Sequence, residues 1–513
     1  MSIPNSSVEN GLIESLLPST SADFVVNVDI GESGPAVRSN PSDQDGSDLN
    51  PYEFMGATGF TLPPPCPIDP FMNRTESITG MYEWIKIIVC LPLALVRLAM
   101  FGVAIVVGFL ATKLALQGWK DKTNPMPRWR SRIMWITRIC ARCILFSFGY
   151  HWIRRKGRPV SRETAPVVVS NHVSYIEPIF YFYELFPTMV SSESHDSIPF
   201  VGTIIRAMQV IYVDRFSAAS RKYAVSEIKR KASSDQFPRV LLFPEGTTTN
   251  GRSLISFQLG AFIPGLPIQP VVVRYPHVHF DQSWGNISLL KLMFRMFTQF
   301  HNFMEVEYLP VVSLSQTKRD DPKCFAEKIS FVMASALNVV QTSHSYGDMM
   351  LFTKALELTK GKSSDYMIEM ARVQNTYSIS TLEALEFLDK FLAMKPDPDG
   401  LVKFRGFLST FNFRTNAIAA KIFDFIDIEK KGSITFRQYL LGSVHILNQP
   451  TFRTKCEAAF NAYCNIFSND DPRCQSVKHL YMFNNNEHAM MSRDDFMAFM
   501  KKNPLLITFF CTH

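Results

Sequence analysis

The stretch Pro166–Pro178, PVVVSNHVSYIEP, joins an apolar run to a histidine and a glutamate. Residues 165–170 (APVVVS) combine β-branched and small side chains, which predicts a buried strand. His172 follows the strand, and Glu177 lies five positions later beside Pro178, a residue suited to the first turn of a helix. The stretch therefore predicts a strand, a loop that carries a histidine, and a helix.

The separation of His172 from Glu177 decides how the two side chains can meet. Residues five positions apart do not stack on one face of a regular helix, so the chain has to turn between them. The carboxylate would then hold one ring nitrogen and stabilise the imidazolium that forms when the other nitrogen accepts a proton. Such an imidazole suits a general base, but a histidine and an acid at a strand end are also common structural features. The pair alone leaves both interpretations open.

Three further short apolar runs are separated by polar segments. They are VIYVD, RVLLF and IQPVVVRY, at residues 210–214, 239–243 and 268–275. Between the first two, Ser220–Ser233 has the pattern of a polar amphipathic helix. Strands that alternate with helices predict an α/β sheet, and we place this domain at residues 161–345.

Polar residues and a glycine gather beside these strands. Arg215 offers a planar guanidinium suited to a phosphate, and Gly246 lets the backbone approach a ligand closely. A base, an anion-binding fork and a Gly-Thr turn at one sheet edge predict group transfer to a hydroxyl of a phosphate-bearing substrate. The residues concerned, besides His172, are Asp214, Arg215, Glu245, Gly246, Thr247 and Pro270.

The segments NHVSYIEP, VIYVDR, FPEGT and PIQPVVV resemble, in order and spacing, the four motifs of the PlsC-type glycerolipid acyltransferases. The resemblance spans roughly residues 80–510 and is closest to the lysophosphatidylethanolamine acyltransferases of plant type. It implies a PlsC-like acyltransferase sheet with flanking helices. It also implies transfer of an acyl chain from acyl-CoA to the free hydroxyl of a lysophospholipid, with lysophosphatidylethanolamine favoured, no required cofactor and no covalent acyl-enzyme.

The resemblance also assigns roles to individual positions. His172 would be the base that deprotonates the acceptor, and Glu177, in the place usually held by aspartate, would orient it. Arg215 and the third motif would contact the glycerophosphate, and Pro270 would shape the acyl or CoA side. The substrate-binding residues implied are Asn171, Asp214, Arg215, Glu245, Gly246, Thr247 and Pro270.

Three positions depart from the family pattern. Glu177 is one methylene longer than aspartate, Gln209 stands where many relatives carry glycine, and Gln258 stands where relatives often carry lysine. Two alternatives therefore stay open. One is a catalytically silent membrane adaptor, and the other is an acyltransferase that acts on lysophosphatidate or glycerol-3-phosphate.

The first part of the chain predicts disorder followed by membrane contact. Residues 1–78 are rich in Ser, Pro, Asn, Asp and Gly, which predicts a disordered segment. Residues 87–112 are long and apolar enough to span a bilayer, although Pro92 and Arg97 also allow a kinked or re-entrant hairpin. A soluble core helix is the third alternative. We assign residues 79–160 to membrane-spanning or re-entrant and interfacial helices.

Residues 132–157 predict a second helix that lies in the membrane interface. Arg138 and Arg142 share one helical face among apolar neighbours, and three aromatic side chains could sit at headgroup level, namely Trp135, Tyr150 and Trp152. The same pattern also fits packing on a globular domain. The chain has a net charge of +7, and its basic run lies next to apolar sequence. That position favours lipid headgroups over nucleic acid as the partner.

Residues 350–513 predict an all-α domain that contains three segments shaped like EF-hand loops, at 395–406, 427–438 and 484–495. Each lacks ligands at key positions, and calcium needs six to eight oxygens. We therefore expect a degenerate EF-hand domain, regulatory or structural, that could hold a protein partner, with calcium binding doubtful. The weak calcium candidates are Asp397, Asp399, Asp427 and Glu429.

Two other patterns have plain explanations. His277, His279 and Asp281 are spaced like metal ligands on one strand face, but the alternation also fits an exposed strand or a packing turn. Cys140 and Cys143 lie in an apolar, helix-like run, which favours buried thiols over a metal or redox pair.

The resemblance implies the endoplasmic reticulum membrane with the catalytic domain in the cytosol. The sequons at Asn5, Asn73 and Asn286 would then stay unglycosylated.

Overall fold

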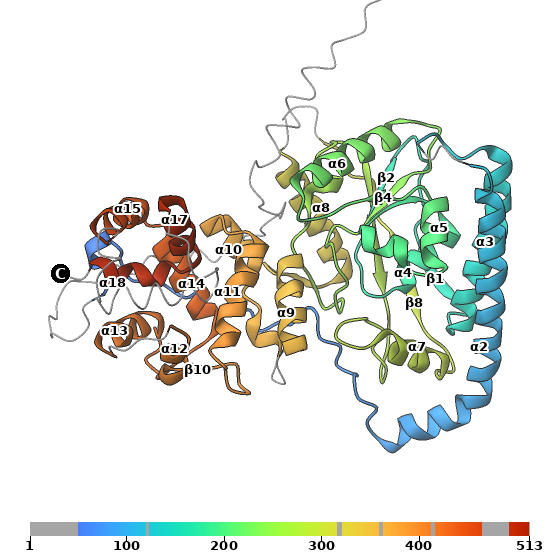
Figure 1. The fold of residues 1–513 in the computed structure, drawn as a ribbon. Helices are drawn as coiled ribbons and strands as arrows, with labels where there is room; N and C mark the ends of the chain where they lie inside the picture. Colours follow the sequence, from blue (N-terminus) through green and yellow to red (C-terminus); the bar gives the residue numbers. More distant parts are fainter. Residues whose placement is uncertain are drawn as a thin grey trace, which may run out of the picture. The chain divides into compact units, whose positions relative to one another are not determined.

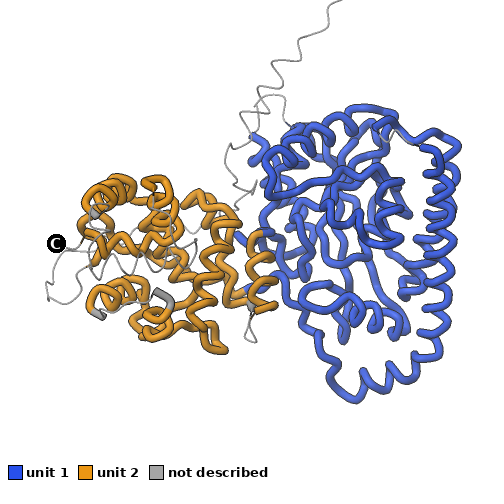
Figure 2. The backbone as a smooth tube through the Cα atoms, in the orientation of Figure 1, with its two compact units in different colours: residues 1–30, 68–346 blue, residues 31–67, 347–513 orange. Residues whose placement is uncertain are grey.

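The chain forms two compact units in a computed structural model. Unit 1 comprises residues 1–30 and 68–346, and unit 2 comprises residues 31–67 and 347–513 (Figure 2). The structure describes residues 50–119, 123–314, 321–358, 363–411, 416–463 and 492–511.

Unit 1 is built on a seven-stranded sheet with the order β1-β8-β7-β2-β5-β3-β4. All neighbouring strands run parallel except β7 and β8, which are antiparallel. The predicted α/β class is confirmed, but three short strands, β1, β3 and β8, were not predicted. The strands are β1 Ile153–Lys156, β2 Val167–Ser170, β3 Thr188–Ser191, β4 Ile211–Tyr212, β5 Val240–Leu242, β7 Ile268–Arg274 and β8 Met304–Tyr308.

Helices cover both faces of this sheet (Figure 1). On β2, Val168 packs with helices α3, α4 and α7, whereas Val167 and Val169 pack with α6 and α8 on the opposite face. The predicted helix Ser220–Ser233 is confirmed as α6. The helices are α3 Arg128–Ser147, α4 Ile176–Glu184, α5 Val201–Ala207, α6 Ala218–Ser233, α7 Leu289–Phe297 and α8 Pro322–Leu337. Smaller elements are η2 Glu193–Ser197, η3 Leu259–Ala261 and the parallel pair β6 Ser253–Leu254 and β9 Val340–Gln341.

Helix α2, Met81–Leu116, lies beside α3 along one side of unit 1 (Figure 1). It contains the predicted span and continues through Pro92, and its length and composition would allow it to cross a membrane. Many large apolar side chains on it are exposed. They include Trp84, Ile85, Ile88, Val89, Leu95, Val96, Leu98, Val103, Val106 and Leu110.

Arg97 lies within the apolar α2, yet its charge is paired with backbone oxygens. The guanidinium donates to the carbonyls of Phe297 (2.9 Å) and Phe300 (3.0 Å), and also to that of Gln299. These carbonyls lie at and after the end of α7, where helix carbonyls lack partners within the helix. The arginine therefore fastens α2 to α7 and the turn after it, and its charge is enclosed by protein.

The predicted interfacial helix over residues 132–157 is wrong in its second half. Helix α3 ends at Ser147, Gly149 turns the chain with φ +88°, and β1 follows. A side chain at position 149 would meet Asn302, so this turn requires a glycine. Tyr150, expected at headgroup level, is buried and donates a 2.6 Å hydrogen bond to Gln282.

The two arginines of α3 also differ from the expectation. Arg138 donates to the carbonyls of Tyr183 and Glu184 at the end of α4. Arg142 donates to the carbonyls of Tyr150 and His151. Both side chains therefore hold protein backbone and not headgroups. Trp135 and Trp152, in contrast, are exposed as predicted.

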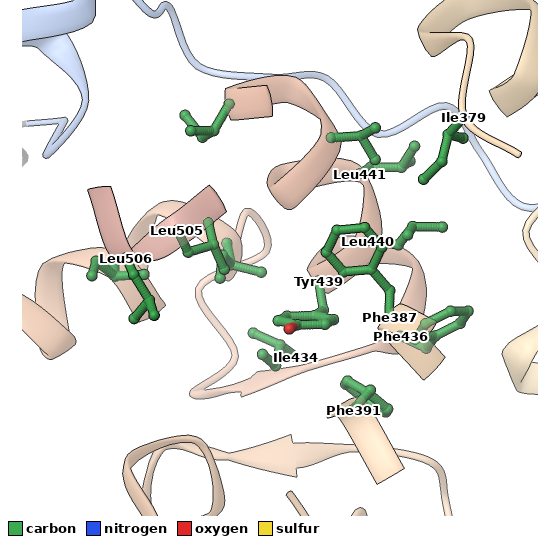
Figure 3. Packing of buried hydrophobic residues seen from close by; sticks show 14 of the residues in the cluster. Ile379, Phe387, Phe391, Ile434, Phe436, Tyr439, Leu440, Leu441, Leu505 and Leu506 are labelled. Atoms are coloured by element: carbon green, nitrogen blue, oxygen red, sulfur yellow. The ribbon is translucent and has the colours of Figure 1, made fainter. Parts of the chain in front are cut away.

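Unit 2 is helical around one hydrophobic core (Figure 3). Two helix–loop–helix pairs, α11–α12 and α13–α14, are joined by the antiparallel strands β10 Val402–Lys403 and β11 Ser433–Ile434. The helices are α9 Tyr346–Leu358, α10 Met370–Tyr377, α11 Thr381–Ala393, α12 Phe404–Phe411, α13 Asn416–Ile426, α14 Phe436–Leu447, α15 Phe452–Tyr463, α17 Arg493–Lys502 and α18 Thr508–Cys511. Short 3-10 turns are η4 Ser363–Tyr366 and η5 Pro504–Ile507.

Residues 50–78, which their composition places in a disordered segment, are ordered. Residues 1–49 lie outside the described part of the chain. Tyr52 and Phe60 are buried in the core of unit 2, on either side of η1 Glu53–Met55 and the turn after it. Phe71 is buried in unit 1. The prediction failed because a few fully enclosed aromatic side chains fix a segment whose average composition is polar.

Candidate active site

His172 and Glu177 meet in the loop between β2 and α4. Nδ1 of the imidazole lies 3.1 Å from Oε2 of the fully buried carboxylate. The same carboxylate accepts from the backbone N–H groups of Val173 (3.2 Å) and Ser174 (2.9 and 3.0 Å). The imidazole side chain remains 17% exposed. The carboxylate is therefore fixed by the backbone of the loop just before α4, and the imidazole ring stays accessible to solvent.

The side chains of Glu245 and Phe243 also hold His172 in place. Glu245 accepts the backbone N–H of His172 at 3.1 Å and that of Ile255 at 3.5 Å. The imidazole stacks on Phe243, with ring centroids 4.1 Å apart and planes inclined by 19°. The carbonyl of His172 accepts from the backbone N–H of Thr249 at 2.8 Å. The FPEGT motif at residues 243–247 therefore positions His172.

Burial gives Glu245 an unusual titration. Removal from water raises the pKa of its carboxyl from 4.5 to about 8, and backbone hydrogen bonds from His172 and Ile255 only partly oppose this. The expected contact between Glu245 and an acceptor phosphate does not fit this environment. This fully buried acid holds two backbone N–H groups of the loop, and its substrate contact stays a prediction.

Arg215 and Gly246 come together from different strands. Gly246 adopts φ +75°, and a Cβ there would lie 3.9 Å from the guanidinium carbon of Arg215. The guanidinium lies 4.3 Å from the ring centroid of Tyr346. Among the described residues, Arg215 has no acidic partner within ion-pair distance. An unpaired, half-buried cation beside a glycine turn suits an anion.

Asn171 and Pro270 are structural in this fold. Asn171 donates to the carbonyl of Val273 (3.0 Å) and accepts from its N–H (2.8 Å), which locks the end of β2 to β7. Pro270, expected at the start of its strand, lies two residues inside β7 and is buried. Its carbonyl accepts from Leu309 just beyond β8. The missing proline N–H is tolerated because β8 ends there.

The two remaining predicted positions lie at the surface of the loops. Asp214 is exposed and accepts from the N–H of Phe216 at 3.0 Å, which closes a turn before α6. Thr247 is half-buried next to Gly246. Neither position contradicts a substrate contact, which stays a prediction for both.

His195 is a neighbour of the site that the sequence did not indicate. It lies on η2 directly after β3, with Nδ1 2.8 Å from the hydroxyl oxygen of Ser191. Partial burial and the positive charge of Arg215 lower the pKa of its imidazole, with a smaller effect from His172. A signal was present, because His195 follows its strand as His172 follows β2. The strand itself was not recognised.

The predicted metal ligands of unit 1 are not brought together. Asp281 is buried and accepts from the N–H of Ser283, whereas His279 is exposed and its ring lies against Tyr82. His277 is bonded to the carbonyl of Tyr275. In the described part of the chain, no group of three His, Cys, Asp or Glu side chains is placed to hold a metal.

Two of the calcium candidates of unit 2, Asp397 and Asp427, accept hydrogen bonds from the backbone of their own loops. Asp397 accepts from the N–H groups of Asp399 and Leu401. Asp427 accepts from the N–H groups of Lys431 (3.1 Å) and Gly432 (2.6 Å).

In the loop at residues 427–438, a lysine also pairs with one of the candidates. The Lys431 ammonium lies 2.5 Å from the carboxylate of Glu429. Of the third predicted loop, residues 484–491 lie outside the described part of the chain.

Known proteins are similar to this chain over most of its length. Residues 153–274 match the model of the Acyltransferase family. The chain is 58% identical over 478 residues to Lysophospholipid acyltransferase LPEAT2 of Arabidopsis thaliana, with 90% of this chain and 89% of the relative covered. It is 30% identical over 414 residues to Lysophosphatidylcholine acyltransferase 2 of Mus musculus, with 78% and 74% covered.

A third relative and a solved structure are also similar to the chain. The chain is 31% identical over 388 residues to Lysophosphatidylcholine acyltransferase of Drosophila melanogaster, with 74% and 72% covered. The crystal structure of the 1-acyl-sn-glycerophosphate acyltransferase PlsC from Thermotoga maritima has a TM-score of 0.37 at 15% identity, with 49% of this chain and 96% of that chain covered. The sequence identities and their coverage show that the chain belongs to the lysophospholipid acyltransferase family.

Proposed function

We propose that the chain transfers an acyl group from acyl-CoA to the free hydroxyl of a lysophospholipid, with His172 as general base and Glu177 as positioning residue. The hydrogen bond between Nδ1 and the buried Glu177 carboxylate carries this assignment. It fixes the tautomer that leaves Nε2 free to accept a proton. Among the described residues, no partner occupies Nε2.

The reaction then proceeds by direct displacement. Nε2 of His172 takes the hydroxyl proton while the hydroxyl oxygen attacks the thioester carbonyl carbon. The tetrahedral intermediate collapses, the carbon–sulfur bond breaks, and the proton on His172 passes to the CoA sulfur. The products are the diacyl phospholipid and free CoA, and the imidazole returns to its neutral form.

Arg215 supplies the contact that suits the acceptor's phosphate. Its guanidinium is half-buried, stacked on Tyr346 and placed next to the open backbone of Gly246. A planar guanidinium can bind two phosphate oxygens at once. His195 lies close enough to feel the charge of Arg215, so it borders the same anion site.

The direct test is the release of CoA thiol by full-length protein in detergent micelles, with acyl-CoA and a lysophospholipid present. We expect His172→Ala to abolish thiol release. His277→Ala is the matched control, because it removes an exposed histidine of the same unit and should leave the rate unchanged. Unchanged turnover in His172→Ala would reject the assigned base. No turnover by the native chain with any acceptor would favour the silent membrane adaptor.

The preferred acceptor is lysophosphatidylethanolamine in our proposal. A panel with one labelled acyl-CoA and acceptors of defined headgroup tests it, including lysophosphatidylcholine, lysophosphatidate and glycerol-3-phosphate. The highest kcat/KM should fall on lysophosphatidylethanolamine. A preference for lysophosphatidate or glycerol-3-phosphate would select the alternative acyltransferase activity.

The proposal also places the chain in the endoplasmic reticulum membrane, with the catalytic unit in the cytosol. The exposed apolar side chains of α2 and the exposed Trp135 of α3 support the membrane contact. The Asn73 amide is buried and donates to the carbonyls of Asp281 and Ser283, which leaves no room for a glycan. Glycosidase treatment should therefore leave the electrophoretic mobility unchanged. A glycan on Asn286 would place the unit in the lumen.

The two helix–loop–helix pairs of unit 2 fit a degenerate EF-hand pair that does not require calcium. Backbone N–H groups already occupy the carboxylates of Asp397 and Asp427. Titration calorimetry of the full chain with calcium should detect no site tighter than micromolar. A sub-micromolar site would contradict this assignment.

A further inference from the structure

Residues 50–62 lie in the core of unit 2, although every other element of that core comes after residue 347. Tyr52 is fully buried, its ring centroid lies 4.8 Å from that of Phe425, and its hydroxyl donates to the carbonyl of Leu505 at 3.0 Å. Met55 and Ala57 are buried in the same cluster. The segment therefore makes the same kind of contacts as a bound peptide.

Phe60 provides a second aromatic anchor. Its ring lies 5.4 Å from Phe425 and 5.9 Å from His445, measured between centroids. A Cβ on Gly442 of α14 would lie 3.2 Å from this ring, so the glycine makes room for it. Tyr52 and Phe60 thus flank Phe425 and enter the helical unit as two separate side chains.

Unit 2 also recognises the backbone of the segment. The ring nitrogen Nε2 of His445 lies 2.7 Å from the carbonyl oxygen of Thr58. The Thr451 hydroxyl donates to the carbonyl of Met55, also at 2.7 Å. Polar side chains that bind main-chain oxygens, combined with pockets for spaced apolar side chains, are the usual means of peptide recognition.

The segment also has a turn and hydrogen bonds of its own. The Asn50 side chain donates to the carbonyl of Ala57 at 2.7 Å and accepts from the N–H of Tyr52 at 2.9 Å. Gly56 closes the turn with φ +70°. A preorganised loop loses less conformational entropy on binding than a flexible one.

We propose that unit 2 is a peptide-binding module whose resident ligand is residues 50–62 of the same chain. The ligand class is an apolar peptide with large side chains at the spacing of Tyr52, Met55 and Phe60. Residues 63–67, PPPCP, are its tether to unit 1. The backbone N–H groups of the loops hydrogen-bond Asp397 and Asp427, and we expect the module to hold this peptide without calcium. The partner expected for this unit is therefore a part of the protein itself.

The test cuts the covalent link between the peptide and unit 2 in the folded, full-length protein, so that only non-covalent contacts can hold the peptide in place. A protease site is inserted between the exposed Pro64 and Pro65 of full-length protein that carries an N-terminal affinity tag. After cleavage in detergent, the tagged fragment is captured, and the captured remainder is measured. We expect the remainder to be captured in both calcium and a chelator. A native remainder that leaves the resin, soluble or aggregated, overturns the proposal, and loss only in the chelator overturns its calcium-free form.

Matched variants locate the contact. Phe60→Asp should lower capture at least tenfold, because a carboxylate cannot enter the aromatic pocket. Thr58→Ala should leave capture unchanged, because that side chain is exposed and only its carbonyl is used. Thr451→Ala removes one hydrogen bond and should lower capture by a smaller factor, which keeps the test valid where Phe60→Asp fails to fold.

A labelled peptide measures the affinity directly. A fluorescent peptide of residues 50–62 is added to the cleaved Phe60→Asp protein after removal of the released fragment. Its anisotropy should rise to saturation, whereas the same peptide with aspartate at position 60 should not bind. Equal binding by both peptides, or by neither, would overturn the assignment of the groove.

Discussion

Glu177 reaches farther than the aspartate that usually holds its place, and the loop uses that reach. Its two oxygens accept from Nδ1 of His172 and from the N–H groups of Val173 and Ser174. These N–H groups belong to the loop just before α4, and Glu177 itself lies in the first turn of α4, where a negative charge is favoured by the helix dipole.

This geometry predicts the effect of removing the charge. Glu177→Gln keeps the size of the side chain but cannot stabilise the imidazolium, so we expect kcat to fall about 10²- to 10⁴-fold with a small change in KM. Glu184→Gln, at the other end of α4, is the control, because its partner is the exposed Arg155. Steady-state kinetics measure both. A loss confined to KM would contradict a role in positioning the base.

Glu245 predicts a pH dependence of stability. The folded chain binds its proton more tightly than the unfolded chain, because burial raises the pKa from 4.5 to about 8. The proton therefore stabilises the fold fully below the lower value, and this contribution is lost as the pH rises toward the higher one. Glu245→Gln cannot titrate.

We expect the thermal midpoint of Glu245→Gln to fall less than that of the native chain between about pH 5 and pH 8. Scanning fluorimetry across this range measures the difference. Glu357→Gln, an exposed glutamate, should follow the native profile. Parallel profiles for Glu245→Gln and the native chain would contradict the assignment.

The strand-end pattern predicted which polar residues lie near one another, but not which of them are buried. His172, Glu177 and Arg215 stand where the motifs indicated, around one sheet edge. Asn171 and Glu245 have side chains equally suited to a ligand, yet both are buried. Adjacent residues of an extended chain point to opposite sides, so when His172 faces outward Asn171 faces the sheet. The sequence alone does not tell which of these two adjacent side chains faces solvent and which faces the sheet.

At the scale of elements, apolar strands could be predicted and polar ones could not. Three of the four predicted strands, β2, β5 and β7, are central and buried, so their β-branched runs stand out. The fourth, β4, is a short strand at the other edge of the sheet, with Ile211 buried. Strand β1 reads IRRK with one buried residue, because it lies at the sheet edge. Strand β8, MEVEY, has the alternation of a half-buried strand and could have been recognised.

The fastening of α2 gives a prediction at this scale. Arg97→Leu removes the donor for the carbonyls of Phe297, Gln299 and Phe300, and each lost hydrogen bond to a charged group costs about 1.5–3 kcal/mol. We expect a clear drop in the thermal midpoint in detergent, although leucine is more apolar than arginine. Arg132→Met, which changes an exposed arginine of α3, should have little effect. Equal midpoints would show that α2 is held by apolar contacts alone.

At the scale of the whole molecule, composition marked the two units but misjudged the segment before α2. The switch from short strands to helical periodicity predicts a boundary between residues 345 and 350. The composition of residues 50–78 predicts disorder because an average over many polar positions hides Tyr52, Phe60 and Phe71. Each of these rings is enclosed by residues hundreds of positions later in the sequence. Local pattern analysis cannot detect such contacts.

The same segment sets the shortest chain that can be handled in the laboratory. A protein that begins at residue 79, just before α2, would lack the buried rings of Tyr52 and Phe60 in unit 2 and of Phe71 in unit 1. Burial of each such ring, the aromatic plugs of the two units, stabilises the fold by about 1.5–3 kcal/mol. We expect that product to precipitate or to be degraded in the host, whereas one that begins at residue 50 should be recovered as a monodisperse peak. Equal yields from the two would show that the plugs are dispensable.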